Sequence, residues 1–237
     1  KRLFTDPDFR PDMLKIYPCM VIPETKLYEE YKKGKFTPIT TKEAISLIKE
    51  FKKYVPPYVR IMRVQRDIPT FMTTAGVDRT NLRQMIDNEG HECKCIRCRE
   101  IGHVFAKKGI TPKKIEIKVL EYKASGGKEF FISAEDFRQN ILIGFCRLRF
   151  PSQNLRKEIK KDSALVRELH VYGEAIEIGA IGDVQHKGWG KKLLKKAEET
   201  AKKHKKKKIV VISGVGVREY YRKLGYRKEG VYMVKNI

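Results

Sequence analysis

The segment that most constrains how this chain folds is residues 185–194, where a polar turn with two glycines leads directly into a helix. The apolar residues that follow repeat with helical spacing, so one face of the helix is expected to be buried. Gly188 and Gly190 allow a ligand to approach the backbone closely. The first-turn amides of a helix lack internal partners and lie at the positive end of its dipole, and flanking lysines add charge. The segment therefore favours a pyrophosphate site, although such a turn is often only a turn.

The sequence after this helix strengthens the prediction of a ligand site. Residues 208–213 form an apolar run typical of a buried strand. A short helix is then expected over residues 217–224, and it contains Tyr220 and Tyr221 and ends at Gly225-Tyr226. This order of strand, Q-x-x-G-x-G turn, helix, strand and tyrosine-bearing helix resembles the acetyl-CoA-binding core of the GNAT acetyltransferases.

A closer resemblance covers nearly the whole chain. Residues 168–173, 185–186, 211–216, 220–226 and 232–235 are similar to the C-terminal domain of the Elongator catalytic subunits. Residues 6–12, 15–18 and 64–69 are similar to the last part of the radical S-adenosylmethionine domain of the same family. The resemblance implies an α/β chain, in which an α+β GNAT domain follows the C-terminal part of a radical SAM β/α barrel. The expected boundaries are 1–75 for the barrel part, 76–112 for a zinc-binding linker and 113–237 for the GNAT domain.

The resemblance also implies an activity, of the archaeal type of this family. Acetyl-CoA would be the acetyl donor, and the wobble uridine 34 of tRNA would gain a 5-carboxymethyl group through a 5′-deoxyadenosyl radical. S-adenosylmethionine and a 4Fe-4S cluster would supply that radical, but the family's C-x-x-x-C-x-x-C triplet is absent from this sequence. Two alternatives stay open: a protein lysine N-acetyltransferase, and a non-catalytic, zinc-stabilised tRNA-binding module.

Individual residues of the expected acetyl-CoA site follow from the resemblance. A splayed strand would place its backbone beside the thioester, and the turn and helix start would surround the phosphates. The residues concerned are Glu168, Leu169, His170, Val171, Gln185, His186, Lys187, Gly188, Trp189, Gly190 and Lys191. A tyrosine of the last helix would protonate or orient the departing thiolate. Tyr220 and Tyr221 point about 100° apart, so one of them is expected to pack in the core, and Tyr221 is preferred for the ligand.

Glu168 and Trp189 each have a second interpretation. Glu168 could activate a water or pair with Arg167 or a lysine, and Trp189 could cover the ligand or pack.

Three cysteines fall within six residues, at Cys93, Cys95 and Cys98. The C-x-C-x-x-C spacing with a histidine on either side can surround one tetrahedral ion, and zinc is the expected occupant. The fourth ligand could be His91, His103 or a distant residue. Free thiols and an iron–sulfur cluster are the alternatives, the latter weakened by the lack of a nearby fourth thiolate. Cys19 and Cys146 are expected to be buried small hydrophobes.

The formal charge of +23 predicts an anionic partner, with nucleic acid as the first candidate. A heat-adapted surface would also be rich in lysine, but it normally balances its signs. The lysine run 202–208 is expected to be a solvated helix end that could also touch RNA phosphates. Better candidates for a tRNA cleft are Arg60, Arg63, Arg66, Arg79, Arg83, Arg97 and Arg99.

The chain has no signal peptide and no long apolar run, so a cytoplasmic protein without a membrane span is expected. The chain begins with Lys1 rather than Met, which favours a processed chain or a piece of a longer one. Homodimer formation is left open.

Periodicity and turn residues predict the remaining elements. A capping box at Thr40 and Glu43 opens a helix that buries Ile45, Ile48, Phe51 and Val55 and stops at Pro56-Pro57. A Gly126-Gly127 turn is expected to join two strands. Strands are expected at 14–22 (interrupted by Pro18), 59–64, 115–122, 129–133, 141–150 and 163–171, and helices at 26–33 and 81–88.

Overall fold

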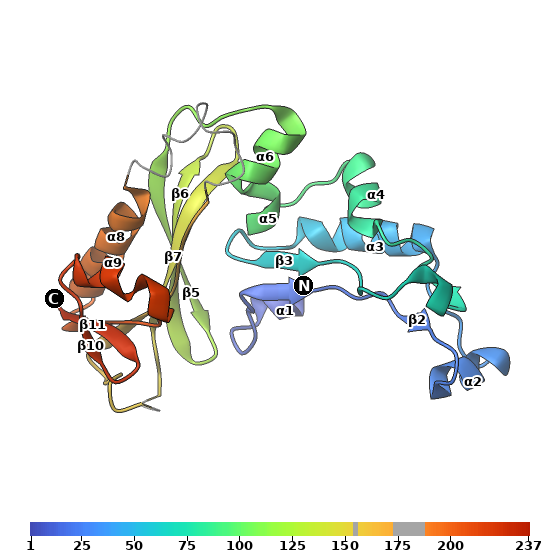
Figure 1. Cartoon of the computed structure of the whole chain (residues 1–237), viewed down its shortest axis with the longest axis horizontal. Helices are drawn as coiled ribbons and strands as arrows, with labels where there is room; N and C mark the ends of the chain where they lie inside the picture. Colours follow the sequence, from blue (N-terminus) through green and yellow to red (C-terminus); the bar gives the residue numbers. More distant parts are fainter. Residues whose placement is uncertain (154–155, 173–187) are drawn as a thin grey trace. The chain divides into compact units, whose positions relative to one another are not determined.

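The computed structural model of the chain describes residues 1–153, 156–172 and 188–237. They form two compact units, drawn with their element labels in Figure 1. The N-terminal unit consists of Lys1–Thr5 and Pro11–Cys98, and the C-terminal unit consists of Asp6–Arg10 and Arg99–Ile237. Each unit is described by itself below.

The N-terminal unit is built on short strands and the helices between them. Its elements are α1 (Arg2–Thr5), β1 (Met13–Lys15), β2 (Met20–Val21), α2 (Lys26–Lys32), α3 (Thr41–Lys53), β3 (Arg60–Arg63), a 3-10 turn η1 (Thr70–Met72), β4 (Ala75–Gly76), α4 (Leu82–Asn88) and α5 (Ile96–Arg99), whose last residue belongs to the other unit. β1 pairs with β3 in parallel and β2 pairs with β4 antiparallel. The chain thus returns through α3 to a parallel neighbour, which is the strand–helix–strand unit of a β/α barrel.

Helix α3 confirms the predicted capping box, because the side chains and backbones of Thr40 and Glu43 bond to each other in both directions. Ile45, Ile48 and Val55 are buried as expected, and Phe51 is partly exposed and lies 5.7 Å from Phe4 between ring centroids. The strand predicted at 14–22 is interrupted around Pro18, as expected, although only Met13–Lys15 and Met20–Val21 are strand. Pro18 lacks an amide hydrogen, and the segment divides into two strands with different partners.

The C-terminal unit is a seven-stranded sheet in the order β10-β11-β9-β8-β7-β6-β5. Its strands are β5 (Glu116–Ala124), β6 (Gly127–Asp136), β7 (Ile141–Phe150), β8 (Ser163–Val171), β9 (Lys208–Val211), β10 (Arg227–Glu229) and β11 (Tyr232–Asn236). Its helices are α6 (Ile101–Lys108), α8 (Trp189–Lys203), the 3-10 turn η2 (Val215–Val217) and α9 (Arg218–Arg222). All neighbouring strands are antiparallel except β8 and β9, which are parallel.

Helix α8 covers one face of this sheet and supplies much of its core (Figure 1). Its apolar stripe of Leu193, Leu194, Ala197 and Ala201 is buried against alternate residues of the central strands, as the helical spacing predicts. The combination of an antiparallel sheet with one parallel pair and a covering helix confirms the predicted α+β fold of this part. Among the described residues, no helix combines the length and apolar character that crossing a membrane would require.

Two local predictions in this fold need correction. The β5–β6 turn consists of Ser125 and Gly126, both with positive φ (46° and 71°), as a two-residue hairpin turn requires. Gly127 is the first residue of β6, where an added Cβ would lie 2.6 Å from the Arg149 guanidinium. Cys19 is exposed, because it lies in the connection between β1 and β2 rather than inside a strand. Cys146 is fully buried, as expected.

Candidate active site and metal centre

Strands β8 and β9 separate part of the way along their length. They pair from Ser163 to Val166, and the last bond of the pair joins the Ile212 amide to the Val166 carbonyl at 3.0 Å. Beyond this point β8 continues to pair only with β7. The splayed strand expected from the resemblance is therefore present, and within the described residues no strand pairs with residues 168–171 on the β9 side.

A β-bulge decides which side chains of this strand face α8. Arg147 lies opposite Glu168 and Leu148 lies opposite Val166, so Arg167 is an extra residue in β8. A bulge shifts the alternation of side chains by one position. As a result Leu169 and Val171 pack on the α8 side of the sheet. Glu168 and His170 occupy the other alternating positions.

The side chains of Glu168 and His170, at the other alternating positions, contact residues of β7. The Glu168 carboxylate accepts a hydrogen bond from Arg147 Nε at 2.9 Å, so an arginine of the neighbouring strand β7 pairs with it, where the sequence had suggested Arg167 or a lysine. Arg167 instead donates to Glu129 at 2.9 Å. His170 stacks beside Phe145 with a centroid distance of 6.0 Å. Neither side chain lines the pocket formed by β8, α8 and α9.

A pocket of about 430 Å³ opens where β8, α8 and α9 meet. Seven of its eight lining residues were predicted from the sequence, and the eighth is Val217; the lining is Leu169, Val171, Gly188, Gly190, Lys191, Val217, Tyr220 and Tyr221. Gly188 caps α8 in the left-handed conformation with φ 70°, and no side chain caps this helix end. First-turn amides and Lys191 therefore stand at the pocket, in an arrangement suited to an anion. Gln185, His186 and Lys187 lie outside the described residues.

Trp189 is packed rather than placed in the pocket lining. It is 8% exposed and belongs to the core under α8, and the Lys192 ammonium lies 4.1 Å from its ring centroid. Of the two interpretations of Trp189, covering the ligand or packing in the core, the described residues agree with packing.

Both tyrosines of α9 line the pocket, and their environments differ. Tyr221 is only 5% exposed, and burial raises its pKa to about 12. Burial also raises the pKa of the half-buried Tyr220. The Tyr220 hydroxyl is buried without a hydrogen-bond partner among the described residues, and a Cβ added to Gly190 would lie 2.8 Å from it. Both phenols therefore keep their protons at neutral pH and are available as hydrogen-bond donors.

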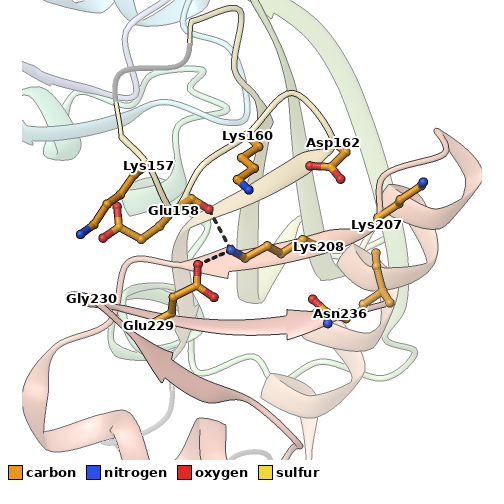
Figure 2. A pocket seen from close by; sticks show the side chains of 10 residues that line it. Lys157, Glu158, Lys160, Asp162, Lys207, Lys208, Glu229, Gly230 and Asn236 are labelled. Carbon is orange, nitrogen blue, oxygen red and sulfur yellow. Dashed lines mark hydrogen bonds and ion pairs between the residues drawn. The ribbon is translucent and has the colours of Figure 1, made fainter.

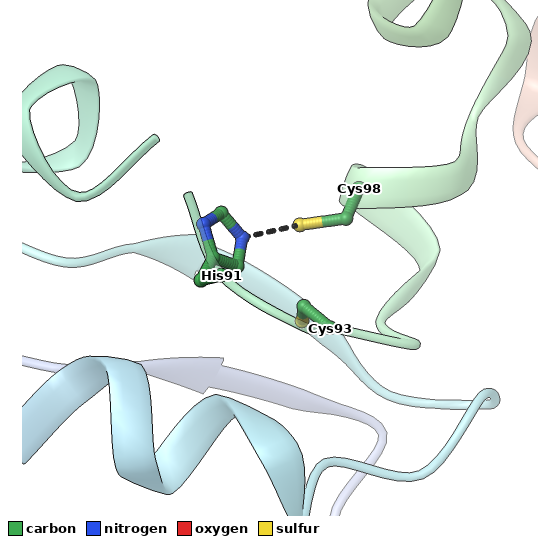
Figure 3. A group of neighbouring side chains, drawn as sticks. All are labelled: His91, Cys93 and Cys98. Carbon is green, nitrogen blue, oxygen red and sulfur yellow. Dashed lines mark hydrogen bonds between the residues drawn. The ribbon is translucent and has the colours of Figure 1, made fainter. Parts of the chain in front are cut away.

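The predicted metal residues gather in the N-terminal unit. Ligand atoms of His91, Cys93 and Cys98 all lie within 4.8 Å of one another. Figure 3 shows the His91 ring facing the Cys98 sulfur, with Nε2 and Sγ 3.7 Å apart. Tetrahedral zinc with bonds of about 2.0–2.3 Å sets its ligand atoms about 3.3–3.8 Å apart. The separation of His91 and Cys98 falls in this range, and the three groups together lie close enough for one ion with a small adjustment.

Cys95 is fully buried beside this group. Its pKa is lowered because its sulfur accepts a hydrogen bond from the side chain of Cys93, which has the larger effect, and another from the side chain of Cys98. The pKa of Cys93 is raised because its thiol is hydrogen-bonded to the Cys95 sulfur. The cluster thus already favours a thiolate, the form in which cysteine binds metal. His103 instead lies 2.9 Å from Glu100 in the other unit.

Two residues that were not predicted, Asp87 and Lys52, lie next to His91 on the side away from Cys98. Asp87 Oδ1 is 3.5 Å from His91 Nδ1 and 3.7 Å from Lys52 Nζ. A carboxylate four residues before a candidate histidine ligand is the only signal in the sequence that could have indicated Asp87. Nothing in the sequence connects Lys52 with this site, because it precedes the cysteines by some forty residues.

The seven predicted arginines are not equally accessible. Arg66 is exposed with its guanidinium carbon 5.8 Å from the Tyr17 ring centroid, and Arg63 and Arg79 are exposed beside Asp67 and Asp78. Three more of these arginines on the N-terminal unit are partly buried: Arg60, Arg83 and Arg97. Arg99 is 2% exposed and pairs with Glu135 at 2.5 Å. Its charge is thus already engaged inside the C-terminal unit.

A second, larger pocket of about 940 Å³ lies on the C-terminal unit (Figure 2). Lysines and acids alternate around it, and Lys208 is held by the Glu158 carbonyl at 3.0 Å and by the Glu229 carboxylate. Its lining is Lys157, Glu158, Lys160, Asp162, Lys207, Lys208, Glu229, Gly230, Asn236 and Ile237. Its lining includes Lys207 and Lys208 of the lysine run 202–208 but no residue predicted for acetyl-CoA or metal binding, and its acids offset most of the positive charge.

Comparisons with known proteins agree with the two-part organisation of the chain. Residues 11–92 match the family described as Radical_SAM C-terminal domain, and residues 181–236 match the family described as Acetyltransferase (GNAT) domain. A tRNA uridine(34) acetyltransferase from Methanocaldococcus infernus is 50% identical over 100% of this chain and 46% of its own length. Elongator complex protein 3 from Danio rerio is 43% identical over 99% of this chain and 44% of its own length.

A solved structure is similar throughout. The archaeal Methanocaldococcus infernus Elp3 with an N-terminus deletion has a TM-score of 0.92 and 48% sequence identity, and it is matched over 100% of this chain and 58% of that one. The chain spans about half the length of the curated relatives that it matches.

Proposed function

Because the chain belongs to the family of tRNA uridine(34) acetyltransferases and Elongator Elp3 proteins, we propose that it binds acetyl-CoA and tRNA for modification of the wobble uridine 34. The expected product of the whole protein is 5-carboxymethyluridine. The pocket formed by β8, α8 and α9 is the observation that carries the proposal. It joins an anion-binding helix start to two protonated tyrosines, as thioester chemistry on a phosphate-bearing carrier needs.

The roles of the three parts follow from this proposal. Residues 1–75 are assigned as the end of the barrel, residues 76–112 as the zinc-binding linker and residues 113–237 as the acetyltransferase domain. Acetyl-CoA would bind with its phosphates at the segment 185–191 and its thioester beside residues 168–171. For Glu168 and His170 the contribution is that of backbone groups, since their side chains are engaged elsewhere.

We assign Tyr221 to the thioester. A phenol with a pKa of about 12 would keep its proton when a thiolate of ordinary pKa, about 8.5, departs. Tyr221 therefore acts by donating a hydrogen bond to the developing negative charge, rather than by complete proton transfer. Tyr220, whose hydroxyl is buried against Gly190, shapes the pocket floor.

Zinc is proposed for the cluster of Cys93, Cys95, Cys98 and His91. The ligand atoms of His91, Cys93 and Cys98 lie within 4.8 Å of one another, and the Cys95 sulfur is hydrogen-bonded to the other two thiols, which together support a Cys₃His site. The ion would fold the linker and take no part in the reaction. Its ligands all lie within the N-terminal unit.

The residues present do not fit the family's radical cluster. The sequence has no C-x-x-x-C-x-x-C triplet; Cys19 is exposed in the N-terminal unit and Cys146 is buried in the sheet of the other. We therefore derive no radical step, and no role for S-adenosylmethionine, from these residues. Five arginines, all those predicted except Arg83 and Arg99, are proposed to contact tRNA phosphates, in keeping with the charge of +23; Arg83 is excluded because it donates to the Ile61 carbonyl beside the cysteines.

The test is release of free coenzyme A from acetyl-CoA by the purified chain, with tRNA, with an unrelated RNA of equal length, and without RNA. Release stimulated by tRNA alone is the expected result. Acetylation of added protein lysines without any effect of tRNA would favour a protein acetyltransferase instead. Binding of tRNA without binding of acetyl-CoA would leave a tRNA-binding module and refute the enzymatic proposal.

A further inference from the structure

A fully buried lysine lies next to the cysteine–histidine cluster. Lys52 is in the last turn of α3 and is 0% exposed. Its Nζ atom has no hydrogen-bond partner within the described ranges, and Asp87 Oδ1 lies 3.7 Å away. Burying an ammonium group costs several kcal/mol unless nearby negative charge compensates it. Its position therefore calls for an anionic environment larger than one carboxylate at this distance.

Asp87 connects Lys52 to the candidate metal ligands. Its Oδ1 atom is 3.5 Å from Nδ1 of His91, and the other ring nitrogen of His91 faces the Cys98 sulfur (Figure 3). Histidines that bind metals usually direct their second nitrogen to a carboxylate, which fixes the tautomer and the ring orientation. The order Lys52, Asp87, His91 and Cys98 is thus the order expected of an outer shell leading to a metal.

Two cations, Lys52 and Arg83, lie close to the negative charges of the cluster. Zinc with three thiolates carries one net negative charge, and Asp87 adds another. Arg83 is half-buried, donates to the Ile61 carbonyl at 3.1 Å and interacts electrostatically with Cys98 and Cys95. Lys52 likewise interacts with Cys98. Two cations therefore face two net negative charges in a partly desolvated site.

We propose that Asp87 and Lys52 are positioning residues of the metal centre. Asp87 holds the His91 ring with Nε2 towards the ion, and the Lys52 ammonium offsets the negative charge of Asp87 and the thiolates. The inference rests on the zinc site of the proposed function. Under this proposal Lys52 of α3 and Asp87 of α4 support the metal site. Neither residue would have this role if the pair only held the two helices together.

Lys49 provides a matched control for simple helix packing. It lies on the same helix, and its Nζ is 3.1 Å from a carboxylate oxygen of Glu89, the residue that caps α4. Lys49 thus links the same two helices through an ion pair, but it is part of no metal-binding group. A packing effect would appear in Lys49→Met as well as in Lys52→Met.

The experiment measures the zinc affinity of the full chain by competition with a chromogenic chelator, for the unmodified protein and four variants. Asp87→Asn and Lys52→Met should each weaken zinc binding about 10–100-fold, as loss of outer-shell partners does. Lys52→Arg keeps the charge and should recover most of the affinity, and Lys49→Met should bind as the unmodified chain does. Unchanged affinity in Lys52→Met, or an equal loss in Lys52→Arg, would overturn the role of Lys52.

Cobalt(II) substitution tests Asp87 independently of stability. In Asp87→Asn the thiolate-to-cobalt absorption should persist while the ligand-field bands change, because the sulfurs are intact and the imidazole is less firmly held. Identical spectra would overturn the role of Asp87. An unmodified chain that binds no stoichiometric zinc would refute the proposed zinc site itself, whereas tight binding unaffected by Lys52→Met refutes only this inference.

Discussion

At the scale of single residues, the two adjacent tyrosines of α9 make the sharpest test of the pocket. Replacing Tyr221 by Phe should slow tRNA-stimulated coenzyme A release roughly 10²-fold, the typical effect of losing one donor to a developing negative charge. Affinity for tRNA should hold. Tyr220→Phe is the matched control and should have the smaller effect; the reverse order would transfer the role to Tyr220.

The raised pKa of Tyr221 adds a pH prediction. An ordinary tyrosine ionises near pH 10, but burial raises the pKa of Tyr221 to about 12. The folded protein therefore favours the protonated phenol, and the donor is lost only as pH rises through the higher value. The Tyr221-dependent part of the rate, taken as the ratio of unmodified to Tyr221→Phe protein, should stay constant from pH 7 to about pH 10.5. A fall of this ratio centred near pH 10 would contradict the buried setting.

Cys95 is the residue on which the metal assignment can be tested most directly. Cys95→Ser should leave less than one zinc per chain and lower the free energy of unfolding by about 4 kcal/mol or more, as loss of a structural metal does. Mass spectrometry of the intact protein and calorimetry measure the two effects. The control variant Cys146→Ala changes a cysteine of the other unit, so the protein should still bind zinc. Full metal content in Cys95→Ser would refute the site.

At the scale of elements, the start of α8 and the tyrosine-bearing α9 fit each other closely. A Cβ on Gly190 would lie 2.8 Å from the Tyr220 hydroxyl and at least 3.7 Å from other atoms. Gly190→Ala should therefore weaken coenzyme A binding by about tenfold or more, measured by calorimetry. Adding Tyr220→Phe removes the colliding oxygen and should restore most of the affinity. A double variant no better than the single one would show that the collision is not the cause.

The elements that sequence predicted well are those set by local chemistry. The bounds of β7 and β8 and the capping box of α3 follow from alternation and from a four-residue motif. The bulge at Arg167 could not be predicted, because it depends on the register with β7, and it determines that Leu169 and Val171, rather than Glu168 and His170, face α8. Lys52 and Asp87 were missed for a similar reason: tertiary packing of α3 on α4 brings them to the cysteines. The prediction for Cys19 was wrong because Pro18 ended the strand expected to bury it.

At the scale of the whole molecule, the charge of +23 makes electrostatic attraction the main source of affinity in any RNA complex. The logarithm of the tRNA association constant should fall linearly with the logarithm of salt concentration. Removing one phosphate contact reduces the slope by about 0.7–0.9. Arg66→Ala, at an exposed site on the N-terminal unit, should produce this reduction, measured by fluorescence anisotropy over a salt range of about 50 to 300 mM.

The control for this prediction separates a located interface from diffuse attraction. Lys228→Ala removes the same unit of charge from an exposed position on β10, away from the predicted arginines in sequence. If tRNA contacts the arginine-bearing face, Lys228→Ala should lower the affinity little and leave the slope unchanged. Equal slopes for the two variants would mean that net charge alone attracts the RNA. The five arginines would then no longer be assigned to a tRNA interface, whereas the assignment of the acetyl-CoA pocket would be unaffected, because coenzyme A release tests it separately.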